Sequence, residues 1–313
     1  MNIEVTTMTT ALVGYTGFVG SNLTQSYPFD HLYNSKNIKD AYGTKPDLLI
    51  YAGVRAEKFL ANQEPEKDLQ VIKEAFENIN KIAPKKLVLI STIDVYKNPV
   101  NVNEDTPIDL RLLHPYGANR YALESKVRSM YEDALIVRLP ALFGDNIKKN
   151  FIYDYIHVIP FQLKIDKFHE LSRQDAFIKQ FYSLQDNGFY KCKPLKKKEA
   201  IELKKHFKNL GFTALNFTDS RNTYQFYNLK YLWKHIETAL SNKIPLLNLA
   251  TEPVGAAELY KFLCNENFKN EVASTPVSYN MTTKFFIDFG GYEGYIFSKR
   301  QVLEEIKEFV EKQ

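Results

Sequence analysis

Three residues have the types and spacing of an acid–base site: Thr92, Tyr116 and Arg120. Tyr116 and Arg120 are four positions apart in a segment with helical spacing, so their side chains share one helix face. A cation beside a tyrosine stabilises the phenolate and is expected to lower the pKa of the phenol toward a value useful for general acid–base catalysis. Thr92 follows an apolar strand, where it could orient a reacting oxygen. The alternative is a surface helix with an incidental Tyr–Arg pair.

A glycine-rich loop follows the first apolar segment. Gly14, Gly17 and Gly20 come directly after residues 11–13, and a helix is expected to start near Phe18. This spacing allows a tight turn, close approach to a pyrophosphate and close helix–strand packing, and a helix N-terminus directs N–H groups at phosphates. Because a strand precedes the loop and a helix follows it, a dinucleotide site is favoured over a purely structural turn. The expected cofactor contacts are Gly14, Thr16, Gly17, Phe18, Val19 and Gly20.

The end of the second expected strand bears on the choice of dinucleotide. A carboxylate there normally binds the ribose 2′-hydroxyl, but this chain has Asn34, Ser35 and Lys36 instead. These side chains could hold a 2′-phosphate, which favours NADP over NAD; a turn with an exposed lysine is the alternative. A hydroxyl, a phenol and a cation near a nicotinamide would form a hydride-transfer site.

The elements that position these residues alternate between strands and helices. Continuous apolar strands in such an alternation predict an α/β fold with a doubly wound, Rossmann-type parallel sheet covered on both faces. The expected strands are 11–13, 31–34, 47–52, 86–91, 134–139 and 246–250, and the expected helices include 69–82, 116–131, 229–240 and 301–310. Residues 150–220 show helices and loops but no strong buried strand.

Composition excludes several classes of protein. The 313 residues are 44% hydrophobic and 25% charged, which argues against disorder and fibrous repeats. Two cysteines cannot form a disulfide framework, and six histidines show no metal-ligand spacing. There is no apolar run of the ~20 residues that a membrane helix needs, and residues 1–10 lack the features of a signal peptide. We therefore expect a cytoplasmic protein with no metal and no membrane partner.

The net charge of +4 is concentrated in one region. Residues 151–220 contain 12 Lys and Arg against 8 Asp and Glu, so they carry the whole excess. Eight lysines lie within 191–208, and a solvated helix face is the favoured interpretation of that run. A nucleic-acid binder would more often spread its charge over a whole face. A local basic region fits a solvated helix face or a pocket for a phosphorylated small molecule equally well, and it argues against genomic nucleic acid as the partner.

Together these residues resemble the extended short-chain dehydrogenase/reductase family, which includes nucleotide-sugar epimerases, dehydratases and reductases. The resemblance covers most of the chain. Beyond the glycine loop, it comprises Tyr51-Ala52-Gly53, the Ser-Thr-x-x-Val-Tyr segment from Ser91, Tyr116-x-x-x-Arg120 and Val137-Arg138-Leu139-Pro140. It implies that Thr92 is the catalytic hydroxyl, that Tyr116 is the acid–base tyrosine and that Arg120 replaces the family's lysine. It also implies cofactor contacts from Tyr51, Ala52, Gly53 and Leu139.

Departures from the family pattern narrow the expected reaction. The stretch before Asp47 is too short for the family's usual third strand–helix unit, and Ala141 stands where epimerases tend to carry asparagine. Both favour the nucleotide-sugar reductase branch. Ile93 takes the place of a dehydratase acid, which argues against dehydration. Tyr51 replaces an asparagine, and an arginine fork is not equivalent to a lysine at position 120.

The resemblance implies that different parts of the chain bind the cofactor and the substrate. Residues 1–145, completed by 226–250, should bind NADP or NAD, while 146–225 and 251–313 should hold a nucleotide-linked sugar. The expected substrate contacts are Asp94, Lys148, Lys149, Asn150 and Arg221. The expected function is keto-sugar reduction or alcohol oxidation. Epimerisation through transient oxidation at C4 and a non-catalytic NAD(P)-binding regulatory or scaffold protein are the alternatives, and a homodimer is expected through the helices near 69–82 and 117–131.

Overall fold

The computed structural model describes residues 8–186 and 188–313 of the chain. The expectations for residues 1–7, including the absence of a signal peptide, lie outside these described residues. By its packing the chain divides into two compact units. Unit 1 comprises the chain up to Ile147 together with Tyr224–Val254 and Ser278–Glu305, and unit 2 comprises Lys148–Thr223, Gly255–Val277 and Ile306–Gln313. Each unit is described by itself.

Unit 1 is built on a six-stranded sheet in which every neighbouring pair is parallel. The strand order is β13-β6-β4-β3-β1-β2. The strands are β1 (Thr10–Val13), β2 (His31–Tyr33), β3 (Leu48–Tyr51), β4 (Lys86–Thr92), β6 (Leu135–Leu139) and β13 (Leu246–Asn248). The chain runs from β1 outward to β2 and then crosses to place β3 on the other side of β1. This reversal is a topological switch point, where open α/β sheets bind ligands beyond the strand carboxyl ends.

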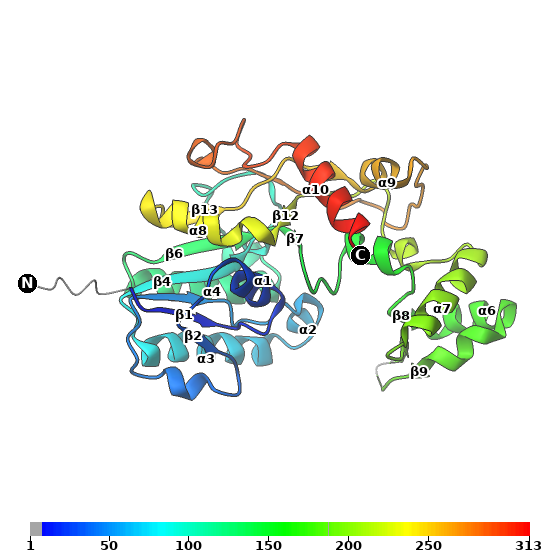
Figure 1. Ribbon diagram of the computed structural model, residues 1–313, viewed down its shortest axis with the longest axis horizontal. Coiled ribbons are helices and arrows are strands. Elements are labelled where there is room, and N and C mark those ends of the chain that lie inside the picture. The colour runs from blue at the N-terminus through cyan, green and yellow to red at the C-terminus, as the bar shows by residue number, and fades with distance from the viewer. Residues whose placement is uncertain (1–7, 187) are drawn as a thin grey trace, which may run out of the picture. The chain divides into compact units, whose positions relative to one another are not determined.

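Helices cover both faces of this sheet, as the apolar strands require. Helices α1 (Phe18–Ser26) and α8 (Leu232–Ser241) pack on one face. Helices α3 (Pro65–Ile82) and α4 (Pro115–Met130) pack on the other (Figure 1). The predicted doubly wound α/β fold is confirmed.

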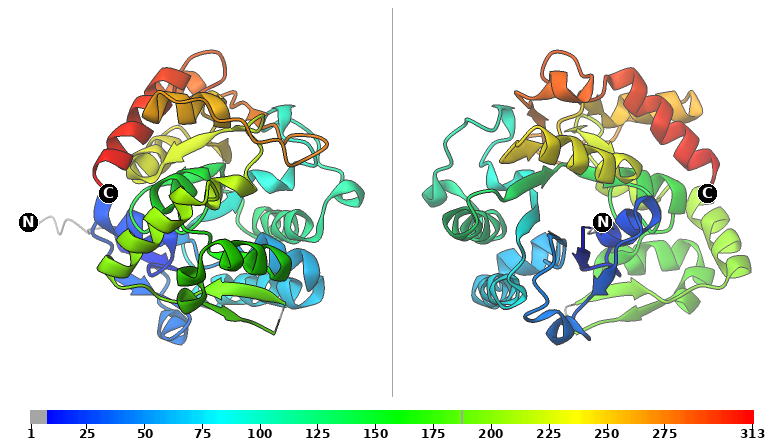
Figure 2. Two further views of the ribbon diagram at one scale, coloured as in Figure 1. Left: turned by 90° about the vertical axis from the view of Figure 1, so that its right-hand side faces the viewer. Right: turned by 60° about the vertical axis from the view of Figure 1, so that its left-hand side comes forward.

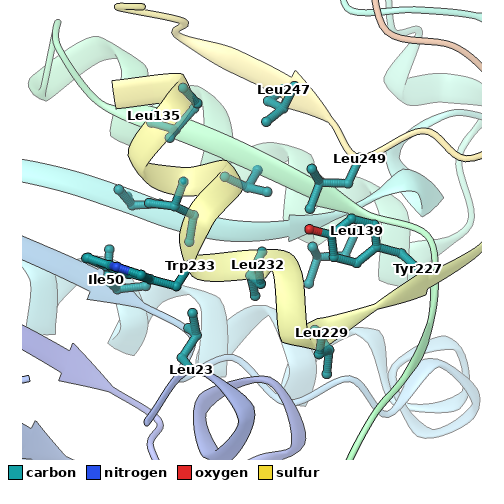
Figure 3. Close-up of a cluster of buried hydrophobic side chains, with 14 of the residues drawn as sticks. Leu23, Ile50, Leu135, Leu139, Tyr227, Leu229, Leu232, Trp233, Leu247 and Leu249 are labelled. Atoms are coloured by element: carbon teal, nitrogen blue, oxygen red, sulfur yellow. The ribbon is translucent and has the colours of Figure 1, made fainter. Parts of the chain in front are cut away.

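Alternation along the strands sends side chains into two separate cores. In β3, Ile50 points to the α1–α8 face, whereas Leu49 and Tyr51 point to the α3–α4 face. Figure 3 shows the α1–α8 core, where Leu23, Ile50 and Trp233 lie around the sheet. Trp233 stacks on Tyr27 with ring centroids 3.8 Å apart. Because it is the chain's only tryptophan, its fluorescence reports on this core.

The connection between the second and third strands is abbreviated, as the sequence predicts. Between Tyr33 and Leu48 the structure has a single 3₁₀ turn, Ile38–Ala41, and β3 pairs directly with β1. A short additional helix, α2 (Lys58–Gln63), precedes α3 and was not expected from the sequence.

Short strands complete unit 1 and shift one expected boundary. Residues 278–305 pack with the sheet unit, although the sequence analysis assigned 251–313 to the substrate lobe. The reason is that β15 pairs with β5, which buries Met281 against Ile93 and Val95. The remaining strands of unit 1 are β5 (Val100–Val102), β7 (Ala141–Phe143), β12 (Phe226–Asn228) and β15 (Asn280–Met281). Three further elements contain a boundary between the two units: β11 (Thr223–Tyr224), β14 (Val254–Gly255) and α10 (Lys299–Glu311).

Unit 2 has a core of its own around a small antiparallel sheet, which the sequence analysis did not predict. Its strand order is β8-β10-β9. Phe168 and Tyr190 stack at 3.6 Å in this core, with Leu203 and Phe207 buried against them. The elements, green in the left view of Figure 2 apart from α9, are α5 (Phe151–His157), β8 (Gln162–Lys164), α6 (Ile165–Gln174), β9 (Tyr182–Leu184), β10 (Phe189–Cys192), α7 (Lys197–Asn209) and α9 (Ala256–Cys264).

Candidate functional site

The glycine loop forms a cradle made of backbone at the switch point. Gly14 has φ +93° and donates its N–H to the Tyr33 carbonyl at 2.7 Å. A Cβ on Gly14 would lie 2.5 Å from the Ala52 carbonyl oxygen, and a Cβ on Gly20 would lie 2.1 Å from the Gly14 carbonyl oxygen. Only glycine fits at both positions. Strand β1, the start of α1 and the end of β3 can therefore approach one another closely.

Helix α1 begins at this cradle with its N-terminus directed into the loop. Gly17 is the N-cap and provides no side-chain acceptor, so no side chain of the cap masks the N–H groups of the first turn. These groups and the helix dipole suit an anionic group such as a pyrophosphate. Thr16 is exposed in the loop, while Phe18 and Val19 pack on the α1–α8 core. The six loop residues predicted from the sequence lie together, in a shape that fits a dinucleotide phosphate.

The segment after β2 lies next to the cradle because Tyr33 pairs with Val13. The Asn34 side-chain oxygen accepts the Lys36 N–H at 2.9 Å, which closes a local turn. The Ser35 and Lys36 side chains are exposed at that turn. Of the three predicted ribose-site residues, Ser35 and Lys36 thus have exposed side chains, whereas the side-chain oxygen of Asn34 already accepts a hydrogen bond from Lys36.

Two predicted cofactor contacts have their side chains in the core. Tyr51 is 3% exposed on the α3–α4 side, and burial raises the pKa of its phenol to about 12. Its hydroxyl accepts a 3.5 Å hydrogen bond from Asn78. Leu139 is buried on the opposite face of the sheet. The backbone of Ala52, whose N–H donates to the Val13 carbonyl at 2.9 Å, lies beside the glycine loop instead.

Thr92 and Tyr116 meet because α4 approaches the end of β4 closely. Thr92 is the last residue of β4, and Tyr116 is the second residue of α4. A Cβ on Gly117 would lie 2.1 Å from the Asp94 carbonyl oxygen, so glycine permits this approach. His114 caps α4, its Nδ1 accepting the Gly117 N–H at 3.1 Å. Burial raises the pKa of the Tyr116 phenol, whereas Thr92 lies close enough to the phenol to lower it. In the sheet order β4 lies next to β3, so this pair is one strand away from the switch point between β1 and β3.

Arg120 stacks on the Tyr116 ring, and its charge is neutralised by an ion pair with Asp68. Its guanidinium carbon lies 3.9 Å from the centre of the Tyr116 ring. It also forms an ion pair with Asp68 of α3 and donates to the Arg55 carbonyl at 2.6 Å. The pKa of Tyr116 is raised, because burial outweighs the lowering by Arg120, and Asp94 and Asp68 raise it further. Arg120 thus acts on this pKa in the expected direction, but burial and the two carboxylates leave the pKa of Tyr116 raised.

Asp94, the predicted substrate residue of unit 1, lies beside this pair and is itself engaged. Its carboxylate accepts from Lys58 of α2 at 2.6 Å, and the His114 ring nitrogen lies 4.0 Å away. Burial and the charge of Lys58 lower the pKa of His114. Lys58 and Asp68 escaped the sequence analysis because they come from a segment that is separated from Asp94 and Arg120 by many residues and carries no motif.

A buried ionic network supports the site from behind. Glu124, fully buried on α4, accepts from Arg138 Nη2 at 2.6 Å and from the Ser91 hydroxyl at 2.5 Å. Arg138, 1% exposed on β6, also donates to the Tyr96 hydroxyl at 2.7 Å. Ser91 directly precedes Thr92, so the network ties the end of β4 to the helix that carries Tyr116.

The other predicted substrate residues belong to unit 2. Lys148 and Lys149 are exposed, and Asn150 caps α5 by accepting the N–H of Ile152 at 3.0 Å. Arg221 forms two hydrogen bonds with the buried Asp219, at 2.9 and 2.7 Å, and a further ion pair with Glu271 at 3.3 Å. Its guanidinium thus stabilises unit 2, which argues against its predicted role in phosphate binding.

Within residues 8–186 and 188–313, no group of three or more His, Cys, Asp or Glu side chains is placed to hold a metal ion. Within the same residues, no helix has the length and apolar character to cross a membrane.

Comparisons with known proteins place this site in a known fold. No family model and no curated protein matches the chain. Among solved structures, dTDP-4-dehydrorhamnose reductase from Bacillus anthracis in complex with NADP is 15% identical and covers 97% of this chain and 99% of its own, with a TM-score of 0.62. WbmG from Bordetella bronchiseptica in complex with NAD and UDP is 14% identical and covers 100% and 96%, with a TM-score of 0.63. UDP-glucose 4-epimerase from Thermotoga maritima with UDP-glucose is 12% identical and covers 96% and 97%, with a TM-score of 0.60. The fold implied by the resemblance to extended short-chain dehydrogenases/reductases is confirmed.

Proposed function

We propose that this protein, which has the fold of nucleotide-sugar reductases and epimerases, is an NAD(P)-dependent oxidoreductase acting on a nucleotide-linked sugar. The observation that carries the proposal is that Thr92 and Tyr116 come together at the carboxyl end of β4, in the same parallel sheet whose strands β1 and β3 end at the glycine cradle. Keto-sugar reduction is the proposed reaction, in which Tyr116, protonated at neutral pH, is the proton donor.

In this proposal the chain binds the reactants and moves one proton. The N–H groups of the first turn of α1, which the glycine loop leaves open, would hold the pyrophosphate of the dinucleotide, and the reduced dinucleotide would supply a hydride to the carbonyl carbon. Thr92 hydrogen-bonds the carbonyl oxygen, and Tyr116 donates its phenolic proton to it, giving an alcohol. Solvent then reprotonates the Tyr116 phenolate. Ser35 and Lys36 favour NADP by offering a hydroxyl and a cation to a 2′-phosphate.

The test is turnover of a panel of nucleotide-linked keto-sugars, followed by the absorbance of the reduced nicotinamide. The wild type should turn over at least one of them. Tyr116→Phe should reduce kcat by about 10²–10⁴-fold, the usual contribution of a positioned general acid. Tyr121→Phe is the matched control, since this half-buried tyrosine lies one turn further along α4 and has no assigned role.

The outcomes separate the alternatives. Equal rates for wild type and Tyr116→Phe would remove Tyr116 from the mechanism. Interconversion of two sugars without net consumption of cofactor would identify an epimerase. Tight binding of cofactor with no turnover across the panel would favour a regulatory protein, and activity gained in Arg120→Lys would show that the arginine has silenced the site.

A further inference from the structure

The segment that contains α2 and α3 holds the first turn of α4 through several side chains. The Asn62 side-chain oxygen accepts the Tyr116 N–H at 3.0 Å. The Asn119 side-chain nitrogen donates to Asp68 at 2.8 Å and to the Pro65 carbonyl at 3.2 Å. The residue that carries the phenol is therefore fixed from the α2–α3 side as well as by the sheet.

Asp68 is the centre of these contacts, and it is the acid that pairs with Arg120. The two side chains are 11% and 6% exposed, so water screens their attraction only weakly. The arginine is also held by the Arg55 carbonyl, which leaves its planar fork turned toward Asp68 and its face against the Tyr116 ring.

The charges around the Tyr116 phenol come from every element packed against it. Arg120 of α4 favours the phenolate, while Asp68 of α3 and Asp94, just after β4, oppose it. Lys58 of α2 is paired with Asp94 at 2.6 Å, and His114 lies 4.0 Å from the same carboxylate. Asp68 thus cancels the charge of Arg120, which stacks on the Tyr116 ring.

We propose that Asp68 is a positioning residue that holds Arg120 against the Tyr116 ring as a neutral, stacked pair, so that the phenol stays protonated until it donates to the carbonyl oxygen. This inference rests on the proposed function for its catalytic consequence. In the reduction, hydride from the reduced nicotinamide forms the new C–H bond, and the phenolic proton completes the alcohol. The reverse oxidation needs a phenolate as base, which an uncancelled Arg120 would favour.

The decisive measurement is the titration of Tyr116 in the full-length protein without cofactor or substrate. Tyrosine labelled with ¹³C at Cζ gives one NMR signal for each of the 20 tyrosines, and Tyr116→Phe identifies the relevant one. Asp68→Asn should shift the midpoint to lower pH than in wild type, since Arg120 then acts without its counter-charge. Arg120→Gln should shift it to higher pH, since Asp68 then acts alone.

The double variant Asp68→Asn/Arg120→Gln is the matched control, because it removes both charges and carries the same substitution at position 120 as the single variant Arg120→Gln. Its midpoint should lie close to that of wild type and below that of Arg120→Gln. If Asp68→Asn does not fold, the comparison of Arg120→Gln with the double variant still tests the effect of Asp68. Equal midpoints for Asp68→Asn and wild type, or for Arg120→Gln and the double variant, would overturn the inference.

Turnover adds a second readout that separates this inference from the proposed function. In Asp68→Asn, the pH profile for oxidation of the sugar alcohol should move to lower pH, whereas Asp68→Glu should retain the wild-type profile. The expected titration shifts with no turnover of any nucleotide sugar would support the role of Asp68 and reject the oxidoreductase. Turnover that depends on Tyr116, with no titration shift in Asp68→Asn, would support the oxidoreductase and reject the role of Asp68.

Discussion

Removing the charge of Glu124 is the sharpest test of the network behind the site. In Glu124→Gln the side-chain oxygen can still accept from Ser91, at 2.5 Å in the wild type. The amide nitrogen, however, then faces Arg138 Nη2, which lies 2.6 Å from the wild-type carboxylate. Two donors would meet where a donor and an acceptor met before. Arg138 would also keep its charge in a place that is 1% exposed.

The expected loss of stability follows from this geometry. Removing one partner of a buried ion pair typically costs about 3–5 kcal/mol, because the remaining charge stays buried without compensation. Ser91→Ala removes a single hydrogen bond to the same carboxylate and should cost about 1.5–3 kcal/mol. Glu124→Gln should therefore destabilise the protein more than Ser91→Ala does.

Urea titrations followed by the fluorescence of Trp233 measure this loss directly. Trp233 is 7% exposed in the α1–α8 core, so its emission follows the unfolding of unit 1. Arg138→Met combined with Glu124→Leu should recover much of the stability, because apolar replacement of a buried pair is often neutral or stabilising. A loss below about 1 kcal/mol in Glu124→Gln, or a larger loss in Ser91→Ala, would refute the assignment of Glu124 as a charged counter-ion.

Three further expectations concern the cofactor site and the core. Gly20→Ala should weaken NADPH binding and destabilise the fold by about 1–3 kcal/mol, because its Cβ would lie 2.1 Å from the Gly14 carbonyl oxygen. The control Gly255→Ala, whose Cβ would have its nearest contact at 3.6 Å, should leave the stability measured by urea titration almost unchanged. Lys36→Ala should raise the Kd for NADPH about tenfold, or ~1.4 kcal/mol, and leave the Kd for NADH unchanged in nicotinamide-fluorescence titrations. An equal rise in the Kd for NADPH and for NADH would exclude a contact between Lys36 and the 2′-phosphate. Burial lowers the pKa of His235 to about 4, so below pH 6.5 the unfolded chain binds more protons than the folded chain. The free energy of unfolding should therefore fall by up to about 3 kcal/mol as the pH drops from about 6.5 to 4. The same fall in the variant His235→Asn would contradict this prediction.

The sheet could be predicted from the sequence because most of its strands are largely apolar and buried. Residues 86–91 and 134–139, for example, are buried on both faces, and such runs have few other stable arrangements. The small sheet of unit 2 could not be predicted in this way. Its strands are three or four residues long and carry lysine as well as aromatic side chains, so they show neither a continuous apolar run nor a clear alternation.

The candidate site could be predicted only as far as it depends on local motifs. The glycine loop and the Tyr116–Arg120 spacing are local, and in the structure the loop lies at the switch point while Tyr116 lies near the end of β4. The charge state around the tyrosine is not local. It depends on Asp68, which lies 52 positions from Arg120 and belongs to no motif. A spacing rule can place a cation beside a phenol, but it does not reveal the acid that neutralises it.

The short edge strands of the central sheet bear on how the protein avoids self-association. Strand β2 has three residues, and so does β13 at the opposite edge. An edge strand offers unpaired backbone groups to any other strand that meets it, and short edges limit how many such groups can act together. The long apolar strands β4 and β6, which would be the most adhesive, lie in the interior of the sheet order. Once folded, unit 1 thus presents little template for aggregation, and lengthening β2 with apolar residues would create one.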